Sequence, residues 1–342
     1  MVKTYYRPTA LVHGPDASRL VAEGRARPLA GSATIAYCQV EVIERKPGAI
    51  ARHFVAAPEV PGLAEIDSAL IAANAQPTIM GIVNVTPDSF SDGGQNQQAS
   101  AAIAHGLRLA GEGAHIVDVG GESTRPGSLG VSEVEELDRV IPVIEGLARE
   151  GIRVSCDTRK AKVMAEALKA GASIINDVSA LGHDPKSIET LAATACPVVL
   201  MHAQGDPRTM QLNPSYEDVS LDVYDYLEAR IVACERAGIA RTRLAADPGI
   251  GFGKTYAHNL EILQQIALYH GLGVPVLVGL SRKSLIGALT GEKVAARRVH
   301  GSVGGAVQAM LNGVQILRVH DVRATVEAIA VARAVGMALF DI

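Results

Sequence analysis

Three segments of the chain share one template, in which a glycine is followed by an apolar run and then by a polar side chain. The segments are Gly113-Ala-His-Ile-Val-Asp118, Gly171-Ala-Ser-Ile-Ile-Asn176 and Gly313-Val-Gln-Ile-Leu-Arg318. A glycine here suits the left-handed end of a helix, and the run that follows suits a buried strand. The polar residue always stands five positions after the glycine. We therefore expect Asp118, Asn176 and Arg318 to lie at one height on three parallel strands, as part of a recognition site.

Apolar runs of strand length recur along the chain from about residue 77. They lie at 78–84, 116–121, 153–157, 173–177, 198–202, 244–247, 274–279 and 315–318, with starts about 20 to 46 residues apart. This spacing leaves room for a helix between parallel strands, and unbroken Val, Ile and Leu runs indicate strands covered on both faces. Eight such units predict a (β/α)8 TIM barrel over residues 77–342. A doubly wound sheet is the rival, but the glycine run at 249–254 lacks dinucleotide-binding and Walker spacing.

Helix signals fill three of the gaps, at 133–148, 159–170 and 218–237. Residues 1–76 differ, because they hold loop-like stretches with one strand-like run at 34–44 and one helix-like run at 63–73. We expect a small N-terminal extension packed on the barrel, without an activity of its own.

Composition excludes several classes of function. The 342 residues are 48% hydrophobic and 20% charged with a net charge of −4, so neither nucleic acid nor an anionic membrane is an expected partner. The start lacks the apolar stretch of a signal peptide, and no apolar segment reaches the length of a membrane span. The cysteines are scattered without metal-ligand spacing, which predicts reduced thiols in the cytoplasm.

One group of polar residues at the strand ends suits a planar heterocycle. Asp157, Asn176 and Asp247 could accept from an N–H-rich ring such as a 2-amino-4-oxopyrimidine, with Lys283 as a donor and Phe252 or Met201 on its face. Each carboxylate alone could equally be the buried partner of an Arg or Lys, because unpartnered buried charge is costly. Taken together they favour a heterocycle pocket.

A second group suits a phosphate or pyrophosphate. Its members are Arg125, Arg282, Lys283, Arg318 and His320, all in or beside strand-end loops. Arginine binds such anions bidentately. Asn84 offers the kind of oxygen that Mg²⁺ accepts, which becomes a credible site if pyrophosphate supplies the rest of the ligands.

Several other polar residues near the strand ends have a structural reading. His202 fits a structural histidine as well as a functional one, and no zinc spacing surrounds it. Glu122, Asp177 and Asp321 are expected to orient loops or basic residues. No serine elbow or Cys/His pair points to covalent catalysis.

Several blocks of the chain resemble the dihydropteroate synthases, a pterin-binding enzyme family of folate biosynthesis, over about residues 78–330. The blocks are Met80-Gly-Ile-Val-Asn-Val-Thr-Pro-Asp-Ser-Phe-Ser-Asp-Gly-Gly94, Asp118-Val-Gly-Gly-Glu-Ser-Thr-Arg-Pro-Gly127, Asp247-Pro-Gly-Ile-Gly-Phe-Gly-Lys254, Ser281-Arg-Lys-Ser284 and Arg318-Val-His-Asp-Val322. The resemblance implies a transferase that condenses a 6-hydroxymethyl-dihydropterin pyrophosphate with 4-aminobenzoate. It would release pyrophosphate and yield dihydropteroate.

The resemblance also implies roles for residues at matching positions. Asp157, Asn176, Asp247 and Lys283 would hold the pterin, and Thr124 and Arg125 would lie on a mobile loop. Asn84, Arg318 and His320 would face the pyrophosphate with Mg²⁺ at Asn84, and the pocket would include Met201, Phe252 and Val319. Arg125, Lys283, Arg318 and His320 are thus the implied catalytic residues. The loops at 85–94 and 123–128 would order around pyrophosphate and complete the aminobenzoate site.

Such a reaction needs no strong base, because the aryl amine is already a neutral nucleophile; the protein must place the amine and neutralise the departing charge.

The chain departs from the family in its longer extension, in Ala180-Leu181 where many relatives have two glycines, and in Leu285 where an aromatic residue or Met is common. Nothing interrupts the run from Arg125 to Gly127, so ordinary sensitivity to sulfonamides is expected.

The closest rival is a pterin-binding methyltransferase barrel that serves a corrinoid protein, which has no use for a pyrophosphate site. A non-enzymatic pterin-binding protein is the second rival, and it would have lost one of the anion-binding elements. The family resemblance further implies a homodimer.

Overall fold

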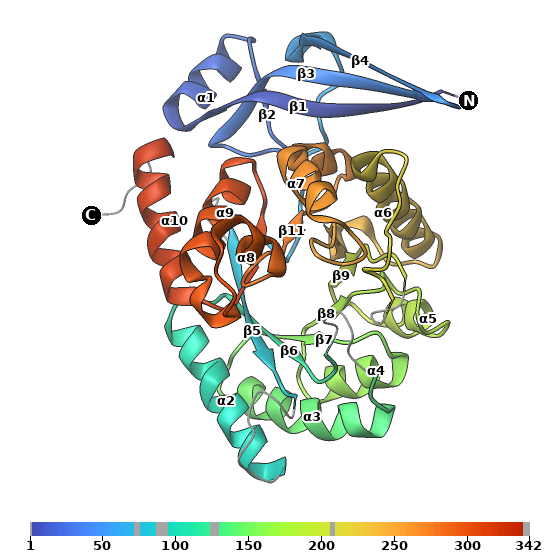
Figure 1. Ribbon diagram of the computed structural model, residues 1–342, viewed down its shortest axis with the longest axis vertical. Coiled ribbons are helices and arrows are strands. Elements are labelled where there is room, and N and C mark those ends of the chain that lie inside the picture. Colours follow the sequence, from blue (N-terminus) through green and yellow to red (C-terminus); the bar gives the residue numbers. More distant parts are fainter. Residues whose placement is uncertain (1, 72–75, 87–94, 124–129, 206–208, 338–342) are drawn as a thin grey trace.

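The computed structural model describes residues 2–71, 76–86, 95–123, 130–205 and 209–337. It consists of a barrel and of an antiparallel sheet that lies across it (Figure 1). None of the described helices combines the length and apolar character needed to cross a membrane.

Eight parallel strands build the barrel, in the order β10-β9-β8-β7-β6-β5-β12-β11. They are β5 (Thr78–Asn84), β6 (Ile116–Gly120), β7 (Val154–Asp157), β8 (Ile174–Asp177), β9 (Val198–Met201), β10 (Leu244–Asp247), β11 (Leu277–Val278) and β12 (Ile316–Val319). A parallel bridge between Ala246 and Val276 joins β10 to the segment before β11 and closes the ring. The predicted barrel is confirmed, with each strand within a few residues of its predicted range.

Helices cover the outside of the barrel between the strands (Figure 1). They are α2 (Gln95–Gly111), α3 (Glu133–Arg149), α4 (Ala161–Lys169), α5 (Ser187–Ala192), α6 (Val219–Arg236), α7 (Tyr256–Gln264), α8 (Ser284–Thr290), α9 (Val299–Leu311) and α10 (Val322–Met337). The three template glycines have the left-handed backbone that the sequence predicted, with φ of 105° at Gly113, 109° at Gly171 and 82° at Gly313.

The N-terminal extension has more regular structure than the sequence predicted. Strand β1 (Lys3–His13) pairs antiparallel with β3 (Ile35–Lys46), which also pairs with β2 (Arg27–Pro28) and β4 (Ala49–Ala56), and α1 (Gly14–Ala22) follows β1. Only β3 was expected. The others were missed because β4 is exposed on both faces and β1 lacks a strict alternation of apolar and polar residues.

The helix expected at 63–73 is wrong, since residues 63–71 form no helix. This segment instead runs along the extension, where the Ile66 amide donates to the Ala30 carbonyl (3.2 Å). Leu70 then enters the barrel and packs on inward-facing side chains of the strands. Those are Met80, Ile116, Ile174, Val199, Ala245, Leu277 and Ile316. The apolar residues that looked helical therefore close the end of the barrel that is opposite the strands' carboxyl ends.

Candidate active site

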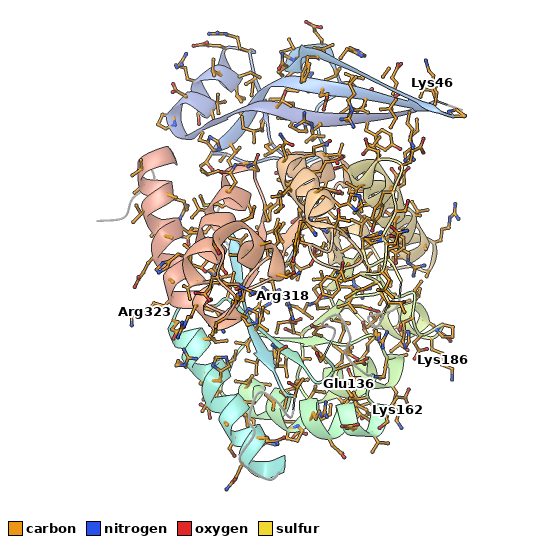
Figure 2. The ribbon with its side chains drawn as sticks, viewed as in Figure 1. Lys46, Glu136, Lys162, Lys186, Arg318 and Arg323 are labelled. Atoms are coloured by element: carbon orange, nitrogen blue, oxygen red, sulfur yellow. The ribbon has the colours of Figure 1, made fainter. Side chains whose placement is uncertain are left out.

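An ion-paired cluster lies at the carboxyl ends of four barrel strands, the face on which barrel enzymes carry their active sites. Arg318 of β12 donates from Nε to Oδ2 of Asp118 (2.6 Å) and from a terminal nitrogen to Oδ2 of Asp157 (2.8 Å). Asn176 of β8 donates to the same oxygen of Asp118 (3.1 Å). Figure 2 shows Arg318 inside the ring of helices. The three template residues thus meet, as the sequence predicted.

One acceptor of this cluster is left over. Oδ1 of Asp118 is buried and has no hydrogen-bond partner among the described residues. A buried carboxylate oxygen without a donor is costly, so such an atom in a native structure calls for a partner from outside the chain. The sequence template placed Asp118 in a recognition site, but Asp118 was not among the residues assigned to the heterocycle or to the anion; the orphaned oxygen is what marks it as a binding group.

The charges in the cluster perturb one another. Burial raises the pKa of Asp157 to about 7, although the guanidinium of Arg318 opposes the rise. Burial lowers the pKa of Arg318, but Asp118 and Asp157 outweigh this effect and hold it above its ordinary value. Arg318 therefore stays charged, while Asp157 changes its charge near neutral pH.

A second pair of opposite charges lies on β10 and just before α8. Asp247 accepts from the Gly249 amide (2.7 Å), and Lys283 donates to the Ile250 carbonyl. Nζ of Lys283 lies 4.6 Å from the centre of the Phe252 ring, within cation–π range. Burial lowers the pKa of Lys283 to about 8, although the negative charge of Asp247 opposes the fall. Burial likewise raises the pKa of Asp247, although the positive charge of Lys283 opposes the rise.

The segment 249–254, which we call the glycine loop, approaches neighbouring backbone so closely at two of its glycines that no side chain would fit there. A Cβ at Gly249 would lie 1.9 Å from the His202 carbonyl oxygen, and one at Gly253 would lie 2.4 Å from that of Gln204. Both glycines also have positive φ, 69° and 62°. The run has no dinucleotide role; its glycines let the loop fold tightly against the segment that follows β9.

Lys254 holds this loop from inside. It is 2% exposed and donates to the carbonyls of Gly249 and Phe252 (3.0 Å each). Its Nζ also lies 2.8 Å from Nδ1 of His202. Burial and the charge of Lys254 hold the pKa of His202 far below its ordinary value, so the ring is neutral. Of the two readings left open for His202, the geometry therefore supports the structural one.

The residues expected to orient their neighbours do so. Asp321 pairs with Arg282 through both carboxylate oxygens. Glu122 pairs with Arg159 (2.6 Å) and with Lys160. Asp177 accepts from the Ser179 amide and hydroxyl (2.6 Å each) and from the Leu181 amide (3.1 Å). Arg282, expected to bind an anion, thus has part of its guanidinium engaged.

The other predicted site residues are placed as follows. Met201 ends β9 and Val319 ends β12, and both are buried. His320 follows β12, and its Nδ1 lies 3.2 Å from the Ser281 hydroxyl. Asn84 ends β5 beside Gly120 of β6. Thr124 and Arg125 lie outside the described residues, as do positions 87–94 and 124–129 of the two loops expected to be mobile.

The donors present would fit a magnesium ion only if phosphate oxygens and water supplied most of its ligands. In the described part of the chain, no group of three or more His, Cys, Asp or Glu side chains could hold a metal. A single amide oxygen at Asn84 matches the sparse protein ligation that Mg²⁺ accepts when phosphate oxygens and water supply the rest.

A cavity of about 280 Å³ opens beside the glycine loop on the same face. Its lining includes Arg159, Ser179, His183, Gly205, Met210 and Phe252. Phe252 therefore lies next to Lys283 and also borders open space large enough for an aromatic ring.

Comparison with known proteins agrees with this geometry. The family model "Pterin binding enzyme" matches residues 80–320. The chain is 49% identical to the dihydropteroate synthase of Escherichia coli K12 over 259 residues, which is 75% of this chain and 91% of that protein. It is 51% identical to that of Neisseria meningitidis serogroup B over 270 residues, 77% of this chain and 94% of that protein.

Solved structures give the same result. The Xanthomonas albilineans dihydropteroate synthase with 4-aminobenzoic acid superposes with a TM-score of 0.72 at 52% identity, covering 76% of this chain and 93% of that one. The Yersinia pestis enzyme in complex with a sulfonamide drug gives 0.73 at 47% identity, covering 78% and 96%. The chain belongs to the pterin-binding enzymes and, among them, to the dihydropteroate synthase family.

Proposed function

We propose that this enzyme condenses (7,8-dihydropterin-6-yl)methyl diphosphate with 4-aminobenzoate to give 7,8-dihydropteroate and diphosphate. The observation that carries the proposal is the ion-paired cluster at the barrel mouth, in which Asp118 keeps an orphaned buried acceptor beside Asp157 and Asn176. A 2-amino-4-oxopyrimidine ring presents N–H groups along one edge, which is what such acceptors require. A related synthase has been solved with 7,8-dihydropteroate, the expected product.

The described residues divide the work between binding and charge stabilisation. Asp118, Asp157 and Asn176 bind the pterin edge, and Lys283 donates to its ring. Arg318 pairs with Asp118 and Asp157 and orients them, and its positive charge faces the leaving group together with His320. Phe252 covers the pterin ring. We retain Arg125 as a predicted ligand of the pyrophosphate and Thr124 as a predicted substrate-binding residue.

The reaction breaks the bond between the pterin methylene and the pyrophosphate oxygen, and forms a bond from that methylene to the aryl nitrogen. The electron pair of the broken bond leaves with pyrophosphate, and the amine loses one proton. Fixed positive charge and the exclusion of water lower the barrier, without a strong base. Asn84 would hold Mg²⁺, which neutralises pyrophosphate charge when bound.

The methyltransferase alternative is not favoured, because the relatives that are about 50% identical to this chain are dihydropteroate synthases.

We also propose a cytoplasmic homodimer. Large apolar side chains stand exposed on α8 and α10, namely Leu289 (63%), Val331 (65%) and Val335 (83%), and burial between two copies would remove them from water. The four cysteines are free, which suits a reducing compartment.

Pyrophosphate release by the purified protein tests this function. We expect release from the pterin substrate only with both 4-aminobenzoate and Mg²⁺, with dihydropteroate formed in equal amount and inhibition by a sulfonamide. Asp157→Ala, Lys283→Ala and Arg318→Ala should each lower the rate at least about a hundredfold. Tight pterin binding without release would reject the synthase in favour of a binding protein.

A further inference from the structure

The N-terminal sheet contacts the barrel through a row of opposite charges. Its barrel-facing side presents Lys3, Arg45 and Arg52, and these contact acidic residues on α6 and in the segment just before it. The acidic residues are Glu217, Asp218, Asp222, Asp225 and Glu228. This sheet precedes the residues 80–320 that the family model matches, so the family does not account for it.

Two of the basic residues hold the beginning of α6. Arg52 contacts Asp218 (2.6 Å), which is the N-cap of this helix and accepts from the Leu221 amide. Arg45 contacts Glu217 and also Asp222 (2.7 Å). The Arg45–Asp222 pair (19% and 25% exposed) and the Arg52–Asp218 pair (30% and 10% exposed) are partly shielded from water, whereas Glu217 is 55% exposed. Figure 2 shows Lys46, the neighbour of Arg45, at the tip of the hairpin that extends over α6.

The beginning of α6 lies on the active-site face of the barrel. Strand β9 ends at Met201, and the segment from His202 to Asp218 connects it to α6. In a parallel barrel, the segment after a strand belongs to the face that carries the chemistry. The N-terminal sheet therefore contacts the end of the loop that connects β9 to α6, and this loop lies on the active-site face.

Tyr216 continues the connection into the site. Its hydroxyl donates to the Gly253 carbonyl (2.6 Å), in the glycine loop and next to Phe252. Gln211 also ties this segment to the glycine loop, by donating to the Gly251 carbonyl (2.7 Å), and within the segment Gln204 donates to the Ser215 carbonyl (3.2 Å). The path from Arg45 and Arg52 to Phe252 thus passes only through Glu217, Asp218, Tyr216 and Gly253.

We propose that the N-terminal sheet is a positioning domain for the active site. Arg45 and Arg52 fix residues 216–218, and Tyr216 then sets the glycine loop that holds Phe252 against Lys283. Neither arginine touches substrate. Their contribution is to order the pocket before the pterin binds, which lowers the entropy lost on binding. This inference rests on the proposed function for its kinetic readout alone.

The test compares Arg45→Ala/Arg52→Ala with Lys3→Ala in the full chain. Lys3 pairs with Asp225 (2.5 Å) and Glu228 (2.6 Å) farther along α6 and is the matched control, because it belongs to the same interface without reaching the loop. We expect the double variant to raise KM for the pterin substrate about tenfold with kcat within about twofold, and Lys3→Ala to change neither. Arg45→Lys/Arg52→Lys should keep part of the positive charge at both contacts and so raise KM less than the alanine double variant.

Tyr216→Phe supplies the second arm and removes only the bond to Gly253. We expect it to raise KM on its own and to add nothing to the double variant, since both interrupt one path. A purely structural interface would lower the melting temperature and the active fraction while leaving KM unchanged. That outcome, or an equal KM change in Lys3→Ala, overturns the proposal.

Hydrogen exchange of the amides in 211–217 and 249–254 separates this inference from the proposed function. Faster exchange in the arginine double variant, and not in Lys3→Ala, supports the positioning role even if the protein releases no pyrophosphate. Unchanged exchange in both segments rejects it whatever the activity.

Discussion

Two buried groups in the site have pKa values that have moved toward each other. Burial raises that of Asp157 to about 7 and lowers that of Lys283 to about 8. An ionised Asp157 accepts N–H bonds from a pterin, and a protonated Lys283 donates one. Since each group must keep its charge, the binding-competent form is most populated between the two values.

We therefore expect pterin affinity to fall below about pH 7, as Asp157 gains a proton, and above about pH 8, as Lys283 loses one. In Asp157→Asn the acid limb should disappear and the alkaline limb should remain, with weaker binding throughout. Titration calorimetry with a pterin between about pH 5.5 and 9.5 measures both limbs. An acid limb that persists in the variant would assign it to another group.

The same shift affects folding. A carboxyl whose folded pKa is raised stabilises the fold below its unfolded value, near 4, and that contribution is lost as the pH rises through about 7. Asp157→Asn should therefore flatten the pH dependence of the unfolding free energy in that range.

The sequence predicted that Asp118, Asn176 and Arg318 would meet, because register follows from a repeated template. It did not predict that Arg318 would pair with both Asp118 and Asp157, since it assigned Arg318 to the pyrophosphate. The choice of partner depends on how the barrel closes, which pairs β12 with β5 and so places it near β6 and β7, the next strands of the ring. Closure is a property of the tertiary structure and leaves no local signal.

At the scale of elements, the loop after β8 shows how a carboxylate can serve structure on the functional face. Ala180 and Leu181 have φ of 51° and 59°, a backbone that favours glycine, and the family resemblance implies glycine at these same two positions. Asp177 offsets the strain by accepting from the Leu181 amide and from the Ser179 amide and hydroxyl. Its pKa is raised to about 6 by burial, against these bonds.

Asp177→Ala should thus destabilise the protein by about 2–3 kcal/mol, because the amides it serves lose charged partners and remain shielded from water. The enzyme that stays folded should keep its KM for the pterin. Asp157→Ala, the matched carboxylate one strand away, should do the reverse and abolish activity with a smaller change in stability. Urea unfolding and steady-state kinetics on both variants decide this. A KM raised by Asp177→Ala would place that carboxylate in the binding site instead.

The elements of the barrel were predictable and those of the extension mostly were not, for a physical reason. A parallel strand covered on both faces must be apolar throughout, so 78–84 and 198–202 stood out. The extension forms an antiparallel sheet with one face on the barrel, and β4 has hardly any buried residue. Its stability comes from pairing with β3 and from charged contacts, which sequence periodicity does not register.

At the scale of the whole molecule, extension and barrel share one hydrophobic core. Tyr5, Leu29 and Ile43 of the extension belong to the same buried cluster as Tyr224 and Tyr269 of the barrel. The rings of Tyr5 and Tyr224 meet edge to face at 5.4 Å. A continuous core predicts that the two parts unfold together.

Ile43→Ala tests this coupling. Ile43 is fully buried on β3, so losing its side chain should cost about 2–4 kcal/mol, and in a single cooperative unit that cost must be felt by the barrel strands too. We expect one thermal transition, shifted downward, with faster hydrogen exchange in β7 and β8 as well as in β3. Val134→Ala, at a side chain 63% exposed on α3, is the control and should shift nothing. Two transitions, with the barrel's unmoved, would show that the extension folds independently. In that case, Arg45 and Arg52 would position the active site through their ion pairs with the barrel alone. A single transition would instead make the sheet part of the scaffold on which the pterin site is built.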